Sequence, residues 1–153
     1  MAHIVAITHK HDRLRQFSLR ALGFRGRYLL HDILQELRRR GHSVTVQHGL
    51  TDRPPPGDLA ILHVDATVTP PEYLEFAARY PDCLNLAVTD ISKRRISGAV
   101  LSPGEAWDGR VIIKSNANFG GRAEMRLNRH AARNGEPAPY PDARLVEDYR
   151  IFD

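Results

Sequence analysis

Two runs of β-branched residues, separated by a helical repeat, restrict this chain to a small set of folds. Residues 3–8 and 43–48 have the composition of buried strands. Between them, apolar residues recur at three- and four-residue spacing from residue 27 to residue 40, and Gly41 marks the end of that helix. The strands of such a strand–helix–strand unit are parallel. The sequence therefore predicts an α/β fold with a parallel sheet.

Two more strands and one more helix continue the alternation. The proline pair at residues 70–71 opens a helix that extends to residue 80, because proline is tolerated in a first helical turn. We therefore predict a doubly wound, mainly parallel, Rossmann-like sheet, flanked by helices over residues 27–40 and 71–80. Its four strands are residues 3–8, 43–48, 58–64 and 83–88.

Polar residues follow the first and third of these strands. His9 and His11 come directly after the first strand, and Asp65 and Thr67 come after the third. In open α/β sheets, ligands bind outside the carboxyl ends of the strands, so these four residues are candidates for contact with a ligand. Two histidines by themselves are a weak signal for a metal site, and we assign no metal ligand.

The alternation changes near residue 90, which divides the chain into residues 1–90 and 91–153. A length of 153 residues suits one domain or two small lobes. The elements expected in the second part are a short helix capped by Thr89-Asp90 and ending at Ile96, a buried strand at residues 111–113, a helix at residues 123–133 and a strand-like run at residues 149–152. Because that last run has no partner in the sequence, we predict an incomplete small α+β lobe.

The composition predicts a cytoplasmic protein. The single cysteine, Cys83, leaves no internal disulfide, and no apolar run approaches the roughly 20 residues that span a bilayer. The net charge of +4 favours anionic partners in general. However, the basic runs are short, and the triplet Arg38–Arg40 ends a helix, where positive charge is favourable. We therefore do not expect nucleic acid as a partner.

Residues 111–122 carry the strongest local signal for a ligand. A β-branched strand ends at Lys114, and Gly120-Gly121 follows in a loop. Paired glycines let the backbone adopt φ > 0 and turn its N–H groups toward an anion, while a lysine adds a point charge for phosphate. The pattern predicts a polyphosphate site. A β-hairpin turn beside an exposed lysine fits the same residues, since Gly-Gly is also a common turn signal.

The best-known phosphate-binding motifs are absent. Ile113 precedes Lys114, whereas the G-x-x-x-x-G-K-[ST] loop requires glycine before its lysine, and no G-x-G-x-x-G follows a strand. The zinc motifs H-E-x-x-H and paired C-x-x-C are also missing. A phosphate site in this chain is therefore neither a Walker loop nor a dinucleotide-binding turn.

The order of the elements resembles the ATP-grasp superfamily. Four βα-type elements are followed by Asn85, Asp90 and Lys93, and then by Val-Ile-Ile-Lys-Ser-Asn-Ala-Asn-Phe-Gly-Gly-Arg at residues 111–122. The first part is similar to the pre-ATP-grasp domain of that family, and the second to the start of its ATP-binding lobe. The Thr-Asp-Ile-Ser-Lys-Arg segment also resembles uncharacterised bacterial ATP-grasp-like proteins. The specific motifs occupy residues 89–97 and 110–124.

The resemblance implies a set of ATP-binding residues. In the family, one basic residue before the lobe and one on the strand preceding a flexible loop contact the phosphates, and these positions correspond to Lys93 (or Arg94) and Lys114. The loop that closes over the β- and γ-phosphates would be Asn118, Phe119, Gly120 and Gly121. Family members activate a carboxylate as an acyl phosphate for attack by an amine or thiol, so a nucleotide and a small-molecule carboxylate are the implied partners.

The chain departs from the family at the metal site. The family takes its Mg²⁺ ligands from the second half of the ATP-grasp fold, and no Glu-x-Asn pair follows a strand in this sequence. We therefore expect ATP and Mg²⁺ as cofactors with the magnesium ligands outside this chain, assign no catalytic residue, and expect no turnover by these 153 residues alone. On this interpretation, the chain is a fragment or a truncated family member.

Two other functions fit parts of the sequence. A non-catalytic α/β binding or scaffold module would need no complete nucleotide lobe. A nucleotide-sugar glycosyltransferase half-domain would explain Arg40-Gly41-His42 after a long helix, but it leaves Lys114 and the glycine pair unexplained.

Overall fold

The structure is a computed structural model that describes residues 1–12, 29–102, 104–146 and 149–152. The chain divides into two compact units. The first unit consists of Met1–Asp65 and Pro70–Thr89, and the second of Ala66–Thr69 and Asp90–Asp153. Residues 66–69, which lie within the predicted first domain at residues 1–90, thus belong to the second unit.

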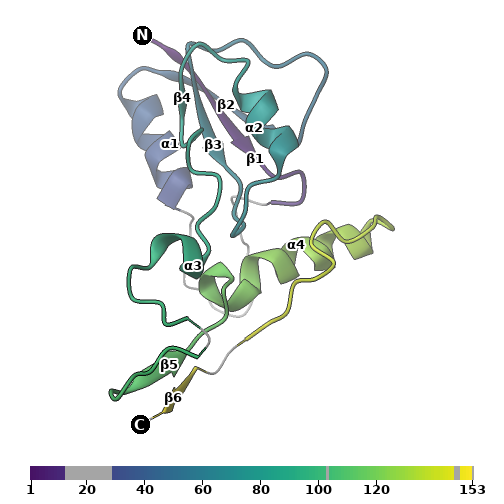
Figure 1. The fold of residues 1–153 in the computed structure, drawn as a ribbon. Coiled ribbons are helices and arrows are strands. Elements are labelled where there is room, and N and C mark those ends of the chain that lie inside the picture. The colour runs from purple at the N-terminus through teal and green to yellow at the C-terminus, as the bar shows by residue number, and fades with distance from the viewer. Residues whose placement is uncertain (13–28, 103, 147–148, 153) are drawn as a thin grey trace, which may run out of the picture. The chain divides into compact units, whose positions relative to one another are not determined.

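The first unit is a four-stranded parallel sheet with helices on both faces (Figure 1). The strand order is β2-β1-β3-β4, so β1 lies between β2 and β3. The strands are β1 (His3–Thr8), β2 (Ser43–His48), β3 (Leu59–His63) and β4 (Cys83–Leu84), and the helices are α1 (Leu29–Arg39) and α2 (Pro71–Ala77). The predicted α/β class and parallel sheet are confirmed.

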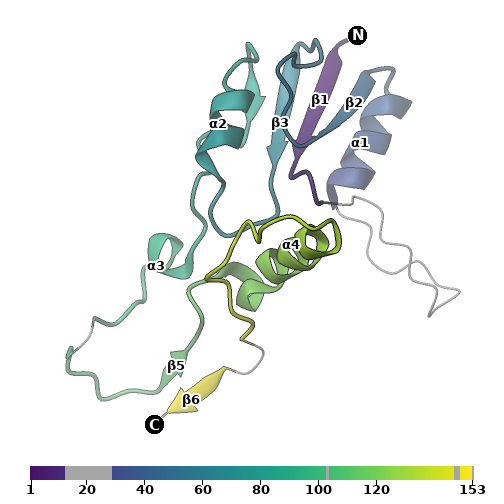
Figure 2. The ribbon, with the colours of Figure 1, turned by 90° about the vertical axis from the view of Figure 1, so that its right-hand side faces the viewer.

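The alternation of side chains along β1 explains why both faces are covered. Ile4 and Ala6 pack with Leu34 of α1, whereas Val5 and Ile7 pack with Phe76 of α2. Figure 2 shows the two helices on opposite sides of the strands. Because both faces of β1 are buried, the side chains at its centre are apolar without interruption and do not alternate between polar and apolar.

The ends of α1 and β4 are set by residues with left-handed backbone. Gly41 has a φ of 86°, and the N–H groups of Gly41 and His42 donate to the carbonyls of Arg38 and Leu37. This Schellman arrangement confirms the predicted C-terminal glycine. The predicted strand over residues 83–88 is wrong beyond Leu84, because Asn85 has a φ of 67° and its side chain donates to the Leu62 carbonyl.

The remaining boundaries differ by a few residues from the predictions. Helix α2 ends at Ala77, not at residue 80, and β3 is one residue shorter at each end than predicted. The predicted start of α1 at residue 27 lies outside the described residues. Within the part of the chain that the structure describes, no helix is long and apolar enough to cross a membrane.

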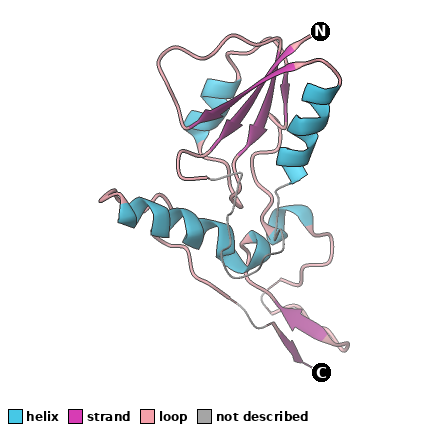
Figure 3. Ribbon diagram, turned by 180° about the vertical axis from the view of Figure 1, so that it is seen from behind, coloured by secondary structure: helices cyan, strands magenta, loops and turns pink. Residues whose placement is uncertain are grey.

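The second unit is built from short elements and one longer helix (Figure 3). They are α3 (Lys93–Ile96), β5 (Val111–Ile113), a 3-10 turn at Asn118–Gly121, α4 (Arg122–Arg133) and β6 (Arg150–Phe152). The predicted helices that end at Ile96 and Arg133 are confirmed. The predicted cap at Thr89-Asp90 is wrong, because Ser92 is the N-cap of α3 and Asp90 instead accepts the Ser92 N–H.

Two predictions about the strands of this unit are wrong. The last strand does have a partner, because β6 pairs with β5 in antiparallel register, with Val111 opposite Phe152. The strand at residues 111–113 is not buried: Ile112 is 48% exposed and Ile113 is 61% exposed. In a two-stranded ribbon the backbones pair with each other, but the side chains on its faces stay accessible unless another element packs on them. The β-branched composition alone does not show whether such an element is present.

Candidate phosphate-binding site

Asn116 joins the start of α3 to the loop that follows β5. The backbone N–H of Lys93 donates to the carbonyl of Asn116 at 3.0 Å, and the N–H of Arg94 donates to its side-chain oxygen at 2.9 Å. Asp90 accepts the Ser92 N–H at 2.7 Å, and this hydrogen bond lowers the pKa of the Asp90 carboxyl. The helix that carries Lys93 is therefore fastened to the exit of the strand that precedes Lys114.

Lys93 and Lys114 meet at the ring of Tyr149. The Lys93 Nζ lies 5.8 Å from the ring centroid and also donates to the Ala117 carbonyl, and the Lys114 Nζ lies 5.7 Å from the same centroid. Both distances are within the range of cation–π attraction. The sequence contains three lysines, and two of them converge on one aromatic side chain. The segments that carry Lys93, Lys114 and Tyr149 are separate in sequence, and their contacts place two positive charges at one ring.

The glycine pair lies against the chain at residues 144–146. Gly120 and Gly121 are buried, with φ values of 66° and 80°. A Cβ on Gly120 would lie 2.3 Å from the Val146 carbonyl oxygen, and one on Gly121 would lie 2.5 Å from that of Arg144. Glycine is therefore required here for close packing as well as for its backbone conformation.

Phe119 is exposed beside the glycines in a strained conformation. Its φ is 46° and its side chain is 68% exposed, while the Arg122 guanidinium lies 5.1 Å from its ring centroid. A bulky residue with left-handed backbone costs about 1–2 kcal/mol relative to an ordinary conformation. Residues in sparsely populated backbone conformations cluster at active sites and ligand clamps.

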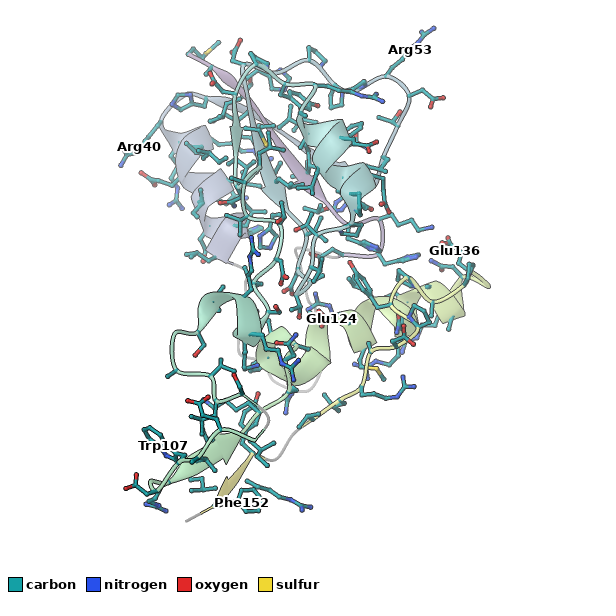
Figure 4. All side chains as sticks on the ribbon, in the orientation of Figure 1. Arg40, Arg53, Trp107, Glu124, Glu136 and Phe152 are labelled. Atoms are coloured by element: carbon teal, nitrogen blue, oxygen red, sulfur yellow. The ribbon has the colours of Figure 1, made fainter. Side chains whose placement is uncertain are left out.

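Thr67 connects the turn, the start of α3 and helix α4. Its hydroxyl accepts the Asn118 N–H at 2.7 Å, and its carbonyl accepts the Ile91 N–H at 2.9 Å. Its own N–H donates to Glu124 Oε1 at 2.6 Å. Glu124 projects from the first turns of α4 (Figure 4) and is 5% exposed. All of these residues belong to the second unit.

The structure thus brings together the two predicted lysines, while the other predicted residues lie on the segments around them. Arg94 is exposed on α3, and Asn118, Phe119, Gly120 and Gly121 form the turn after β5. Sequence reasoning missed Glu124 and Tyr149, and placed Thr67 only at the edge of the parallel sheet. Nothing local marks Glu124, because a glutamate in a helix is ordinary until the fold buries it.

The predicted ligand edge of the first unit holds a packed cluster of rings. The His9 ring stacks on Tyr73 with centroids 5.5 Å apart, and the His11 N–H donates to His9 Nδ1 at 3.1 Å. Burial raises the pKa of Tyr73, whose hydroxyl accepts the Lys10 N–H. His9 and His11 are buried. Among the described residues, no group of three or more His, Cys, Asp or Glu side chains is arranged to hold a metal ion.

Comparisons of this chain with models of known protein families, with curated proteins and with solved structures found no match. The function proposed below therefore rests on the geometry of the second unit and on the resemblance of its motifs.

Proposed function

We propose that the second unit binds the phosphates of ATP, and that the chain is the N-terminal part of an ATP-grasp-like, ATP-dependent carboxylate–amine or carboxylate–thiol ligase. The observation that carries the proposal is the convergence of Lys93 and Lys114 on Tyr149. In the resembling family these two positions supply the cations that contact the phosphates. The first unit would be the Rossmann-like, doubly wound pre-ATP-grasp domain, which agrees with its strand order and with the helices on both faces of its sheet.

The chemistry of the lysines suits a polyphosphate. Each ammonium group is a compact charge with three donors, and the cation–π contact with Tyr149 limits the positions that both side chains sample. In a ligase, catalysis would consist of positioning and neutralisation of the triphosphate charge by these lysines. Mg²⁺ would take its ligands outside this chain, as the resemblance implies.

The expected affinity of this chain alone is modest. An exposed charge contact contributes about 1 kcal/mol or less, so two lysines support only weak binding of the triphosphate. We therefore expect binding of ATP with Mg²⁺ in the high micromolar to millimolar range, which corresponds to roughly 4–6 kcal/mol, and no hydrolysis.

The three lysines of the chain supply a matched experiment. Lys93→Ala and Lys114→Ala should each weaken binding of Mg²⁺–ATP about fivefold, as expected for loss of about 1 kcal/mol. Lys10→Ala, in the first unit, is the control and should leave the affinity unchanged. Calorimetric titration with ATP, and with AMP as a ligand lacking the terminal phosphates, measures these effects. Equal affinity for ATP in all four proteins, or steady ATP hydrolysis, would exclude the proposed site.

One observation favours a second candidate function, a non-catalytic α/β binding or scaffold module. Gly120 and Gly121 pack so closely against residues 144–146 that this packing alone explains why both positions are glycine, without a bound nucleotide. A protein that binds no ATP at millimolar concentration, yet remains folded, would support this alternative.

A further inference from the structure

Besides Asn116, Thr67 also joins the two segments that carry the candidate lysines. Its carbonyl accepts the N–H of Ile91, two residues before Lys93, and its hydroxyl accepts the N–H of Asn118, four residues after Lys114. A bridge between Val68 and Asp90 extends the first of these contacts. The position of Thr67 therefore constrains the backbone that precedes Lys93 together with the backbone that follows Lys114.

Glu124 holds Thr67 by a short hydrogen bond in a buried environment. The Thr67 nitrogen lies 2.6 Å from Glu124 Oε1, which is short for an N–H···O hydrogen bond. The second carboxylate oxygen, Oε2, is buried and has no hydrogen-bond partner among the described residues. A neutral amide oxygen would also accept one N–H, with less loss of hydration than a carboxylate.

We propose that Thr67, held by the buried carboxylate of Glu124, is a positioning residue that fixes the spacing of the two phosphate-binding lysines. This inference rests on the proposed function. Thr67 touches neither lysine side chain in the hydrogen bonds described, so it acts through Asn118 and Ile91. Replacing Thr67 by valine tests the role of the hydroxyl, because valine has nearly the same shape but lacks the acceptor.

The test compares Thr67→Val with Thr67→Ser, which keeps the hydroxyl. In the protein without ligand, amide hydrogen exchange at Asn118 should be at least about tenfold faster in Thr67→Val and unchanged within twofold in Thr67→Ser. The affinity for Mg²⁺–ATP should fall about fivefold in Thr67→Val and stay within twofold in Thr67→Ser. Rescue by serine separates the hydroxyl from the bulk of the side chain.

Two further variants separate positioning from stability. In a Lys93→Ala, Lys114→Ala background, Thr67→Val should weaken any remaining ATP binding by less than twofold, because its effect passes through the lysines. Glu124→Leu, which keeps most of the bulk but removes the acceptor of the Thr67 N–H, should lower the affinity for Mg²⁺–ATP about threefold. A fall in melting temperature with unchanged affinity would make Glu124 a structural residue and overturn its part in the inference.

The outcomes distinguish this inference from the proposed function. If the unmodified protein binds ATP and Thr67→Val binds equally well, Thr67 is no positioning residue, although the lysine site stands. If the unmodified protein binds no ATP, the proposed function fails and this inference fails with it. Exchange at Asn118 that is unaffected by Thr67→Val would also overturn the inference, because the hydroxyl would not hold the turn.

Discussion

Gly120 and Val146 lie so close together that no methyl group fits between them. A Cβ on Gly120 would approach the Val146 carbonyl oxygen to 2.3 Å, and the Val146 N–H donates to the Gly120 carbonyl at 3.0 Å. The turn after β5 is thus joined to the chain that leads to Tyr149, whose ring the two lysines approach. A glycine that a phosphate site would require for its backbone is also required for this packing.

We expect Gly120→Ala to destabilise the second unit much more than Gly135→Ala. Both glycines have left-handed φ values, 66° and 68°, so each alanine costs about 1–2 kcal/mol for its backbone. Only Gly120 has atoms close to the new methyl group, which adds about 1–3 kcal/mol of overpacking. Denaturant unfolding of both variants measures the difference. Equal losses would mean that the 144–146 segment moves away without cost.

Replacing Ile113 by threonine should have little effect on folding. Ile113 is exposed on β5, and threonine is also favourable in strands, so we expect a change in unfolding free energy below about 0.5 kcal/mol. Leu127→Ala in the same unit is the comparison, because Leu127 is fully buried and its truncation should cost about 2–5 kcal/mol. A large loss in Ile113→Thr would show that a further element covers the β5–β6 ribbon in solution.

The ring of Tyr149 should change the NMR chemical shifts of the Lys93 and Lys114 side chains. Protons near the face of an aromatic ring are shielded, and both Nζ atoms lie within 6 Å of the Tyr149 centroid. Tyr149→Ala should shift the Hε signals of Lys93 and Lys114 downfield, whereas Tyr149→Phe keeps the ring and should leave them nearly unchanged. The Lys10 signals provide the reference. Insensitivity of both lysines to loss of the ring would contradict the convergence.

The start of α3 should loosen in acid because of Asp90. The Ser92 hydrogen bond lowers the pKa of the Asp90 carboxyl in the folded protein, so the ionised form stabilises this turn. That contribution is complete above the unfolded pKa of about 4 and is lost as the pH falls through the lower folded value. The amide signal of Ser92 should titrate below about pH 4 and should not do so in Asp90→Asn. A midpoint at or above the ordinary value would refute this.

The secondary structure could be predicted where local rules act alone. The apolar run at residues 3–8, the helical spacing before Gly41 and the helix that ends at Arg133 all appear in the structure. These features depend on backbone propensity, side-chain periodicity and the left-handed preference of glycine, which a short stretch of sequence contains in full. The left-handed conformation of Gly120 and Gly121 was predicted on the same ground.

The partners of these elements were decided by the tertiary structure. Whether β5 is buried depends on what packs on it, and the sequence does not reveal that β6 is its partner or that both faces keep exposed isoleucines. Likewise, Asn85 ends β4 through a bond to Leu62, which is 23 residues away. Long-range pairing of this kind has no local signature, because it depends on the free energy of the whole fold.

The candidate site divides in the same way. The sequence by itself determined the chemical types, namely two lysines near a glycine turn, because charge and backbone freedom are properties of the residues. Only the tertiary structure decided that Tyr149 receives both lysines, that Thr67 belongs to the second unit and that Glu124 is buried beside it. The physical reason is that burial and the distances between segments far apart in sequence follow from packing, which no residue specifies alone.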